Sequence, residues 1–473
     1  MQRALLLLLI AVSYILFAGG PRWTLVPLAL LTGAAILVAP KRTLAFPFEG
    51  RALDLSLAGL VAALAVQLAP LPQSIVSLMS PHAADLRASL QFRTFTDSAW
   101  VRLSVDPART QDALAIVVLA IAAFWIARGV FSFGGSTRHF RRALALVGAA
   151  AALSAIIFRA TAPGLVNGIL QPEARSANPF GAFINRNHLA GWLLLVAGPV
   201  CGYLIAHLRT HPAYRQRFGI GLKQFLASGA MVTALAAMVI VGMLLLTLSR
   251  SGAAGLGAAA IFGWRVGRQR LRIERTNLPV ILAIAGIGLL AAVLFVDMAG
   301  WTTRIEESFD TSNDRNRITI WRESLPIVRD FWFSGTGAGT FGDAMIKYQQ
   351  SRVWVGSMNR WAHFNTAHSH YVQLIVEGGL MVFVPVIAAL ASLIALGRRA
   401  VREDRGEMQW ARIGAGAALI GIGVQSIWET SLVMPANAIL CGVVAGLLVY
   451  QRPKAMGRVE PSTDQLRPRG AAR

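Results

Sequence analysis

The chain has 473 residues, of which 55% are hydrophobic and 14% are charged. Soluble domains usually carry about 25% charged residues, so this composition excludes an ordinary soluble domain and favours a polytopic membrane protein. The 45 lysines and arginines outnumber the 23 acidic residues, but most of this excess falls in short loops between apolar segments, where it sets membrane orientation rather than indicating nucleic-acid binding.

About twelve apolar segments approach the length that crosses a bilayer. The predicted helical spans are 4–19, 23–39, 53–70, 112–131, 143–159, 188–208, 225–248, 252–264, 278–299, 372–397, 410–428 and 436–450. The first could also be a cleaved signal peptide, but a second apolar segment follows at once, which favours a retained span. Cys201 and Cys441 lie inside spans and offer neither a disulfide framework nor a zinc-binding spacing.

Basic residues are concentrated in alternate loops. They cluster at 41–51, 128–142, 209–223, 265–275, 398–405 and after 451. The positive-inside rule therefore places both termini in the cytoplasm, and it places loops near 71–111, 160–187 and 300–371 on the outer side. We predict one transmembrane domain over 1–450, with an ordered cap in the 71–111 loop, and a basic, disordered cytoplasmic tail over 451–473.

The longest polar interval, 301–377, precedes the tenth span. Arg317 and Trp321 are spaced i to i+4, which predicts one helical face, although a solvated amphipathic helix has the same spacing. A histidine is the usual general base near neutral pH, which makes His368 and His370 candidates. A His-x-His pair can also bind metal, but no third ligand has a recognised spacing, so we predict no metal and no cofactor. Glu377 could orient a histidine, pair with an arginine or cap the tenth span.

Further polar residues stand beside span ends on the predicted outer face. Arg186 and Asn187 open the sixth span, where they could also snorkel or cap, and Arg250 precedes the eighth, where it could also snorkel. Together with Arg317 and His368 they converge at headgroup depth. Guanidinium groups bind phosphate oxygens in pairs, so this convergence predicts a site for a lipid-linked diphosphate.

Five stretches stand out: residues 178–191, the Ser-Arg-Ser-Gly run at 249–252, the Arg317–Trp321 pair, the glycine turn at 335–341 and residues 367–380. Together they resemble the O-antigen ligase and polymerase family of bacterial membrane glycosyltransferases. The resemblance implies an all-α polytopic membrane protein with about 12 transmembrane helices, a large periplasmic loop and a lipid-dependent, GT-C-like architecture. It also implies a bacterial inner-membrane enzyme that takes a glycan from undecaprenyl diphosphate. The acceptor would be the lipid A core or another lipid-linked glycan.

The family pattern matches Arg250, Arg317 and His368 in this chain, and we predict these as the catalytic residues of a metal-independent, inverting transfer. The family usually has His-Asn-x-x-Leu, whereas Ser369 and Val372 stand here in place of Asn and Leu. That departure leaves His370 as an alternative working histidine. The predicted substrate-binding residues are Arg186, Asn187, Arg315, Trp321, His370, Tyr371 and Glu377.

Two alternatives stay open. A ligase would transfer the glycan to the lipid A core and a polymerase to another lipid-linked unit, and the long 71–111 loop slightly favours an exopolysaccharide polymerase. A transporter or flippase would need polar groups along a midplane path, whereas mid-span positions here are nearly all Leu, Ala, Val, Ile and Gly. A non-catalytic scaffold would leave the costly outer arginines unexplained.

Overall fold

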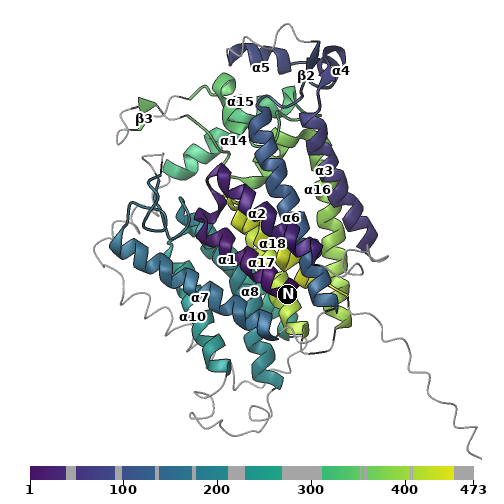
Figure 1. Ribbon diagram of the computed structural model, residues 1–473. Helices are drawn as coiled ribbons and strands as arrows, with labels where there is room; N and C mark the ends of the chain where they lie inside the picture. The colour runs from purple at the N-terminus through teal and green to yellow at the C-terminus, as the bar shows by residue number, and fades with distance from the viewer. Residues whose placement is uncertain are drawn as a thin grey trace, which may run out of the picture.

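The structure is a computed structural model that describes residues 1–38, 50–90, 99–133, 138–172, 177–210, 229–268, 312–351, 354–355, 360–361, 363–404, 406 and 408–451. These residues form a bundle of long helices with a smaller cap at one end (Figure 1). The bundle helices are α1 (Gln2–Ile15), α2 (Leu25–Leu37), α3 (Arg51–Leu68), α6 (Pro107–Phe133), α7 (Arg138–Thr161), α8 (Arg186–Thr210), α10 (Gly229–Leu246), α11 (Arg250–Arg268), α16 (His370–Glu403), α17 (Met408–Gln425) and α18 (Pro435–Val449).

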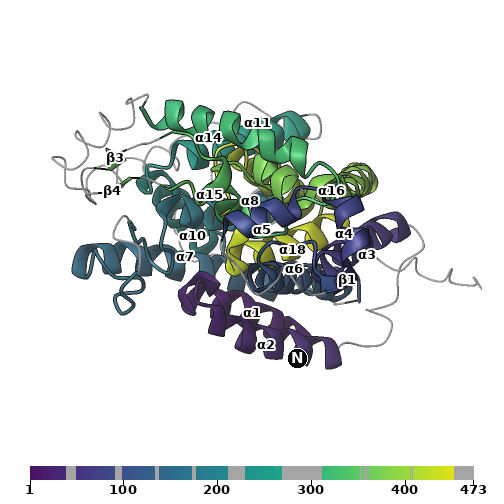
Figure 2. The ribbon, with the colours of Figure 1, turned by 90° about the horizontal axis from the view of Figure 1, so that it is seen from above.

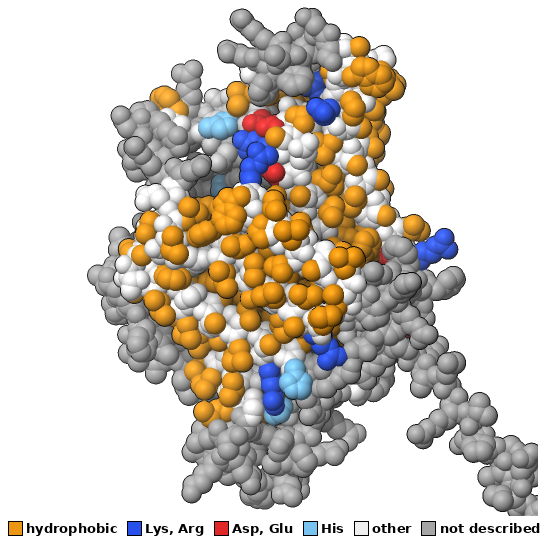
Figure 3. Space-filling model, in the orientation of Figure 1, with side chains coloured by type: hydrophobic (Ala, Val, Ile, Leu, Met, Phe, Trp, Pro, Cys, Tyr) orange, Lys and Arg blue, Asp and Glu red, His pale blue; other side chains and the backbone are white. Residues whose placement is uncertain are grey.

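A helix stands at every predicted span that falls within the described residues. The ninth predicted span, 278–299, and the predicted tail after 451 lie outside them. Among the described helices, six are long and apolar enough to cross a membrane, namely α3, α6, α7, α8, α10 and α16, while α1, α2 and α18 are apolar but shorter. Figure 3 shows a broad apolar band across the middle of one face, with charged side chains gathered above and below it. The chain is therefore a helical membrane protein.

Helices α8 and α18 lie near the centre of the bundle, with α1 and α2 along one edge (Figure 2). Glycines allow the central helices to pack closely. A Cβ atom at Gly198 of α8 would lie 2.3 Å from the carbonyl oxygen of Gly414 in α17, and one at Gly442 of α18 would lie 2.2 Å from that of Ala120 in α6. Small residues at such crossings bring helix backbones together inside a membrane, which accounts for much of the glycine content of the spans.

The cap joins two loops that are far apart in the sequence. The first contributes β1 (Leu71–Pro72), α4 (Gln73–Met79), α5 (Ala83–Ser89) and β2 (Trp100–Val101). The second contributes α14 (Ser312–Asp330), α15 (Phe341–Tyr348), β3 (Trp354–Val355) and β4 (Arg360–Trp361). Strand β1 pairs antiparallel with β2, and β3 with β4. Leu86 and Leu103 from the first loop share one apolar cluster with Ile327 and Phe341 from the second, so the two loops fold as a unit.

The loops predicted on the outer side meet at the cap end of the bundle. Arg22, before α2, forms an ion pair with Asp112 of α6 at 2.7 Å, and Asn167 donates to the carbonyl of Ile15 at 2.9 Å. Met1 lies away from the cap (Figure 1). The Gln451 amide, just after α18, donates to the Ser132 hydroxyl at the far end of α6. The predicted membrane topology, with cytoplasmic termini and a periplasmic cap, stays a prediction.

A glycine turn connects the cap to α16 and depends on positive backbone angles. Gly335, Gly337 and Gly339 have φ values of +63°, +108° and +81°. The buried Glu377 carboxylate accepts the Gly339 and Phe341 amides at 2.8 and 3.1 Å, while the Glu377 carbonyl accepts the Gly337 amide at 3.0 Å. The charge of Glu377 is thus used within the chain, to hold this turn.

Gly335→Ala is expected to destabilise the protein. The new Cβ would lie 2.2 Å from the Glu377 carbonyl oxygen, at a backbone angle that alanine rarely adopts. Strain of this kind costs about 1–3 kcal/mol, so the midpoint of thermal unfolding of the purified protein should fall. Gly257→Ala in α11 is the control, because no atom lies within 4 Å of its Cβ position and alanine favours a helix over glycine by about 1 kcal/mol. Equal midpoints for both variants would contradict the prediction.

Candidate active site

A buried carboxylate, Glu429, joins three separate parts of the chain at the cap end of the bundle. It lies between α17 and the short 3-10 helix η8 (Ser431–Val433), and its side chain is 2% exposed. It accepts a hydrogen bond from the Asn187 side-chain amide at 2.6 Å and an ion-paired one from the Arg317 guanidinium at 3.0 Å. Arg186 interacts with it electrostatically. Glu429 is not among the site residues predicted from the sequence.

The start of α8 is held in place by polar contacts on both sides. The Asn185 side chain accepts the Asn187 amide at 2.8 Å, which caps the helix. The Asn187 carbonyl in turn accepts the Gln425 side-chain amide at 2.8 Å, from the end of α17. Asn185 therefore caps α8 and leaves the Asn187 side chain to bind Glu429. The N-terminal end of a helix carries partial positive charge, which adds to that of Arg186.

Helix α14 presents Arg317 and Trp321 to the same region, as their spacing predicts. Arg317 reaches Glu429, and the Trp321 indole N–H donates to the Ala367 carbonyl at 2.8 Å. Ala367 directly precedes His368. One face of α14 therefore fixes both the guanidinium and the backbone that carries the candidate histidine. Arg315 precedes this face, and its side chain lies outside the described residues.

His368 occupies a left-handed backbone conformation, with φ of +48°. The next residue, Ser369, caps α16 by accepting the Val372 amide. Burial, and after it the positive charge of Arg317, lower the pKa of His368 to about 4. The imidazole is therefore neutral near pH 7 and able to accept a proton. His188, one residue after Asn187, also interacts with His368 electrostatically, and the sequence analysis gave it no role in the site.

Arg250 is the first residue of α11, and its side chain is exposed. The Ser249 hydroxyl caps this helix by accepting the Gly252 amide at 3.1 Å. A Cβ atom at Gly252 would lie 2.8 Å from that of Ala190, one turn beyond Asn187 in α8. The start of α11 therefore packs beside the start of α8. This places Arg250 at the same end of the bundle as Arg186, Asn187, Arg317 and His368, and the convergence of their side chains on one ligand stays a prediction.

Three predicted substrate-binding residues have partners within the fold. The His370 amide donates to the Ser426 carbonyl at 2.9 Å, and the Tyr371 hydroxyl to the Gly423 carbonyl at 2.8 Å, so both attach α16 to the end of α17. Glu377 holds the glycine turn. His368 rather than His370 interacts with Arg317, which favours His368 as the working histidine.

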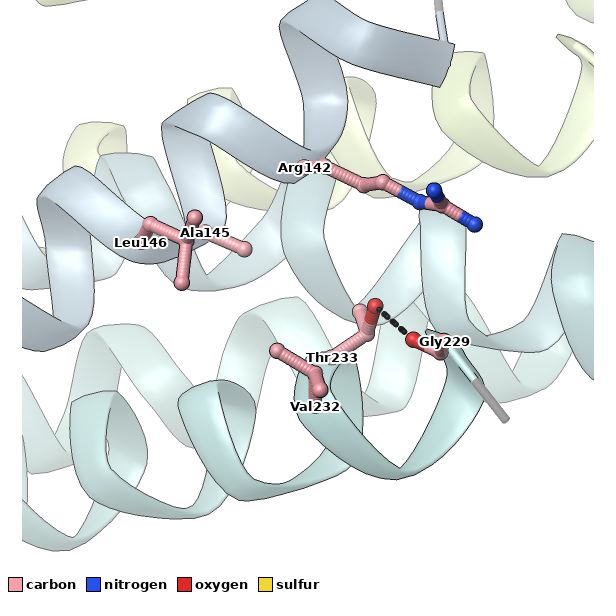
Figure 4. Close-up of a pocket in the computed structure, with 6 residues that line it drawn as sticks. All are labelled: Arg142, Ala145, Leu146, Gly229, Val232 and Thr233. Carbon is pink, nitrogen blue, oxygen red and sulfur yellow. Dashed lines mark hydrogen bonds between the residues drawn. The ribbon is translucent and has the colours of Figure 1, made fainter. Parts of the chain in front are cut away.

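A small cavity in the described part of the chain lies elsewhere. It has a volume of about 150 Å³ between α7 and α10 and is lined by Arg142, Ala145, Leu146, Gly229, Val232 and Thr233 (Figure 4). Arg142 and Gly229 stand near the starts of these helices, and no candidate site residue lines it. Among the residues that the structure describes, no group of three or more His, Cys, Asp or Glu side chains could hold a metal ion.

The fold and this cluster define a helical membrane protein with a polar, arginine-rich site at one end of its bundle. Residues 234–387 match the family model described as O-Antigen ligase. This match confirms, over that segment, the resemblance predicted from the sequence. A search of curated proteins found no match. The matched segment includes Arg250, Arg317 and His368, whereas Asn187 and Glu429 lie outside it. The match supports an enzyme of the glycosyltransferase type that transfers glycans.

Proposed function

We propose that the protein moves a glycan from undecaprenyl diphosphate to a hydroxyl of the lipid A core or of another lipid-linked glycan, at the periplasmic face of the bacterial inner membrane. The observation that carries the proposal is the cluster at the cap end, where Arg317 and the α8 N-terminus meet Glu429 beside a neutral His368. About twelve membrane-spanning helices, a GT-C-like architecture and cytoplasmic termini belong to the same proposal.

The arginines suit a diphosphate leaving group. Breaking the bond between the anomeric carbon and the phosphate oxygen leaves the electron pair on the diphosphate, so the departing group needs stabilisation of negative charge. Arg250 and Arg317 would bind its oxygens, with Arg186 and the start of α8 nearby. Charge-assisted pairs of this kind strengthen where water is partly excluded, and fixed positive groups at a developing anion are a major source of catalysis. No metal is required for this stabilisation.

His368 would act on the acceptor. Its neutral imidazole takes the hydroxyl proton while the acceptor oxygen forms its bond to the anomeric carbon. The bond to the diphosphate breaks on the opposite side of that carbon, so one displacement inverts the anomeric configuration. The Trp321–Ala367 hydrogen bond holds the backbone just before His368, and the His368 ring interacts electrostatically with Arg317. Asn187, Trp321 and the α16 residues His370, Tyr371 and Glu377 would shape the pocket or hold its walls.

The proposal is tested with the purified full-length protein in proteoliposomes. The donor is a glycan on undecaprenyl diphosphate, and the lipid A core and a second lipid-linked glycan are offered as separate acceptors in the presence of a chelator. We expect a new glycosidic bond and free undecaprenyl diphosphate without any ion gradient, and the acceptor used distinguishes a ligase from a polymerase. Movement of the donor between leaflets with no new bond would instead support a flippase and overturn the proposal.

A further inference from the structure

Glu429 occupies an unusual place for a carboxylate. The groups around it are those that the proposed function assigns to an anionic donor: the Arg317 guanidinium at 3.0 Å, the Asn187 amide at 2.6 Å and, through electrostatic interaction, Arg186. A buried carboxylate left in that position would repel a diphosphate. A site built to bind phosphate therefore has to move or neutralise this charge when its ligand arrives.

We infer that Glu429 is a stand-in anion, which holds Arg317 and Asn187 in position in the donor-free protein and takes up one proton when the donor diphosphate binds. This inference rests on the proposed function and adds a positioning residue to it. The covalent change is small: one proton moves from solvent to a carboxylate oxygen of Glu429, and it returns to solvent after the diphosphate leaves. Arg317 is thereby released from its ion pair and becomes available to phosphate oxygens.

The charged and titratable groups that face Glu429 support the exchange. Arg317 comes from α14 and Arg186 from α8, while His368 stands beside Arg317 and His188 interacts with His368. Burial raises the pKa of Glu429 to about 7, against the opposite effects of Arg317, Asn187 and Arg186. Near neutral pH the carboxylate is therefore already close to its protonated form. A diphosphate nearby adds like charge, which raises the pKa further.

The sign of the pH dependence follows from linkage. Because the pKa of Glu429 is higher with donor bound than without it, binding takes up a proton. Affinity for the diphosphate is then constant well below pH 7 and falls as the pH rises above the donor-free pKa of about 7. The fall approaches about tenfold for each pH unit until the donor-bound pKa is reached. A purely structural Glu429 would give no such slope.

The test measures equilibrium binding to the full-length protein in nanodiscs between about pH 6 and pH 9. The probe is a short prenyl diphosphate capped with one hexose, because each of its phosphates then carries a single, strongly acidic proton and keeps a constant charge over this range. We expect the wild-type dissociation constant to rise above about pH 7, up to about tenfold per unit. Glu429→Gln should give a flat profile with tighter binding than wild type at the alkaline end. Glu429→Asp should keep the slope.

Controls separate this effect from others. Glu403→Gln removes an exposed carboxylate that pairs with Arg399 on α16, so it should retain the wild-type profile. Thermal midpoints of all variants show whether they are folded. A flat wild-type profile would overturn the inference, and so would a slope that survives in Glu429→Gln. If the slope survives there but is lost in His368→Ala or His188→Ala, the proton is taken up by a histidine instead. If the wild type does not bind the probe at any pH, the proposed function fails as well.

Discussion

His368→Ala is expected to lower the rate of glycan transfer by about 10²–10⁴-fold, the usual contribution of a general base. The reason is the protonation state of the His368 imidazole. Burial and Arg317 lower the pKa of His368 to about 4, so at pH 7 the imidazole is neutral; because the low pKa also weakens it as a base, the loss should lie toward the lower end of this range. The measurement is the initial rate of product formation in proteoliposomes, at saturating donor and with several acceptor concentrations. Protein level and thermal midpoint should stay close to those of wild type.

His370→Ala is the matched control, two residues along the chain. The His370 amide binds the Ser426 carbonyl, and alanine keeps that bond, so the loss of rate should be much smaller than for His368→Ala. A larger loss for His370→Ala would show that His370 is the working histidine, the alternative that the sequence left open. Full activity in both variants would remove the imidazole from the mechanism. For the wild type, loss of His368 function is expected only on acidification toward its low pKa, because protonation removes the base.

The positions of the bundle helices could be predicted from the sequence because a long apolar segment alone indicates a helix that can cross a membrane. Each bundle helix described between α1 and α18 could be predicted from its own segment of sequence, without information on the helices that pack against it. Arg317 and Trp321 could be placed on one face of α14 for a similar reason, since helical periodicity is a local property. The partners of that face, Glu429 and Ala367, could not be predicted from the sequence.

Glu429 was missed because its importance is entirely tertiary. Its partners Arg317 and Asn187 are 112 and 242 residues away along the chain. One signal was available: Glu429 is a single carboxylate in a short loop, predicted on the outer side, that contains no Lys or Arg. A charge at the membrane edge is costly unless it is paired, so a distant basic partner could have been sought. Glu377, in contrast, was selected from the sequence, but its role was not. The sequence left three roles open, and the hydrogen bonds that its carboxylate accepts from the glycine turn could only be found in the fold.

Arg317→Ala is expected to lower transfer strongly and also to destabilise the protein. Removal of one donor from a site that stabilises developing negative charge costs about 10²–10³-fold in rate. The same change leaves the buried Glu429 without its guanidinium, and breaking a buried ion pair costs about 3–5 kcal/mol where the remaining charge cannot be neutralised. Because the pKa of Glu429 is about 7 and the Arg317 side chain is 20% exposed, Glu429 can take up a proton near neutral pH, so we expect a loss below that range at pH 7 and a larger one at alkaline pH. Initial rates and thermal midpoints measure the two effects separately. Arg399→Ala, which breaks an exposed pair on α16, should change neither.

The double variant Arg317→Ala with Glu429→Gln separates the two roles of Arg317. Glutamine removes the buried charge and can still accept the Asn187 hydrogen bond, so the thermal midpoint should return most of the way to the wild-type value. Transfer should stay as low as in Arg317→Ala, because no neutral side chain supplies the positive charge that a departing diphosphate needs. Arg317→Lys keeps one charge but loses the planar fork, so its rate should be intermediate. If the double variant instead regains transfer, Arg317 serves only to neutralise Glu429, and the diphosphate must be stabilised by Arg250 and Arg186 alone.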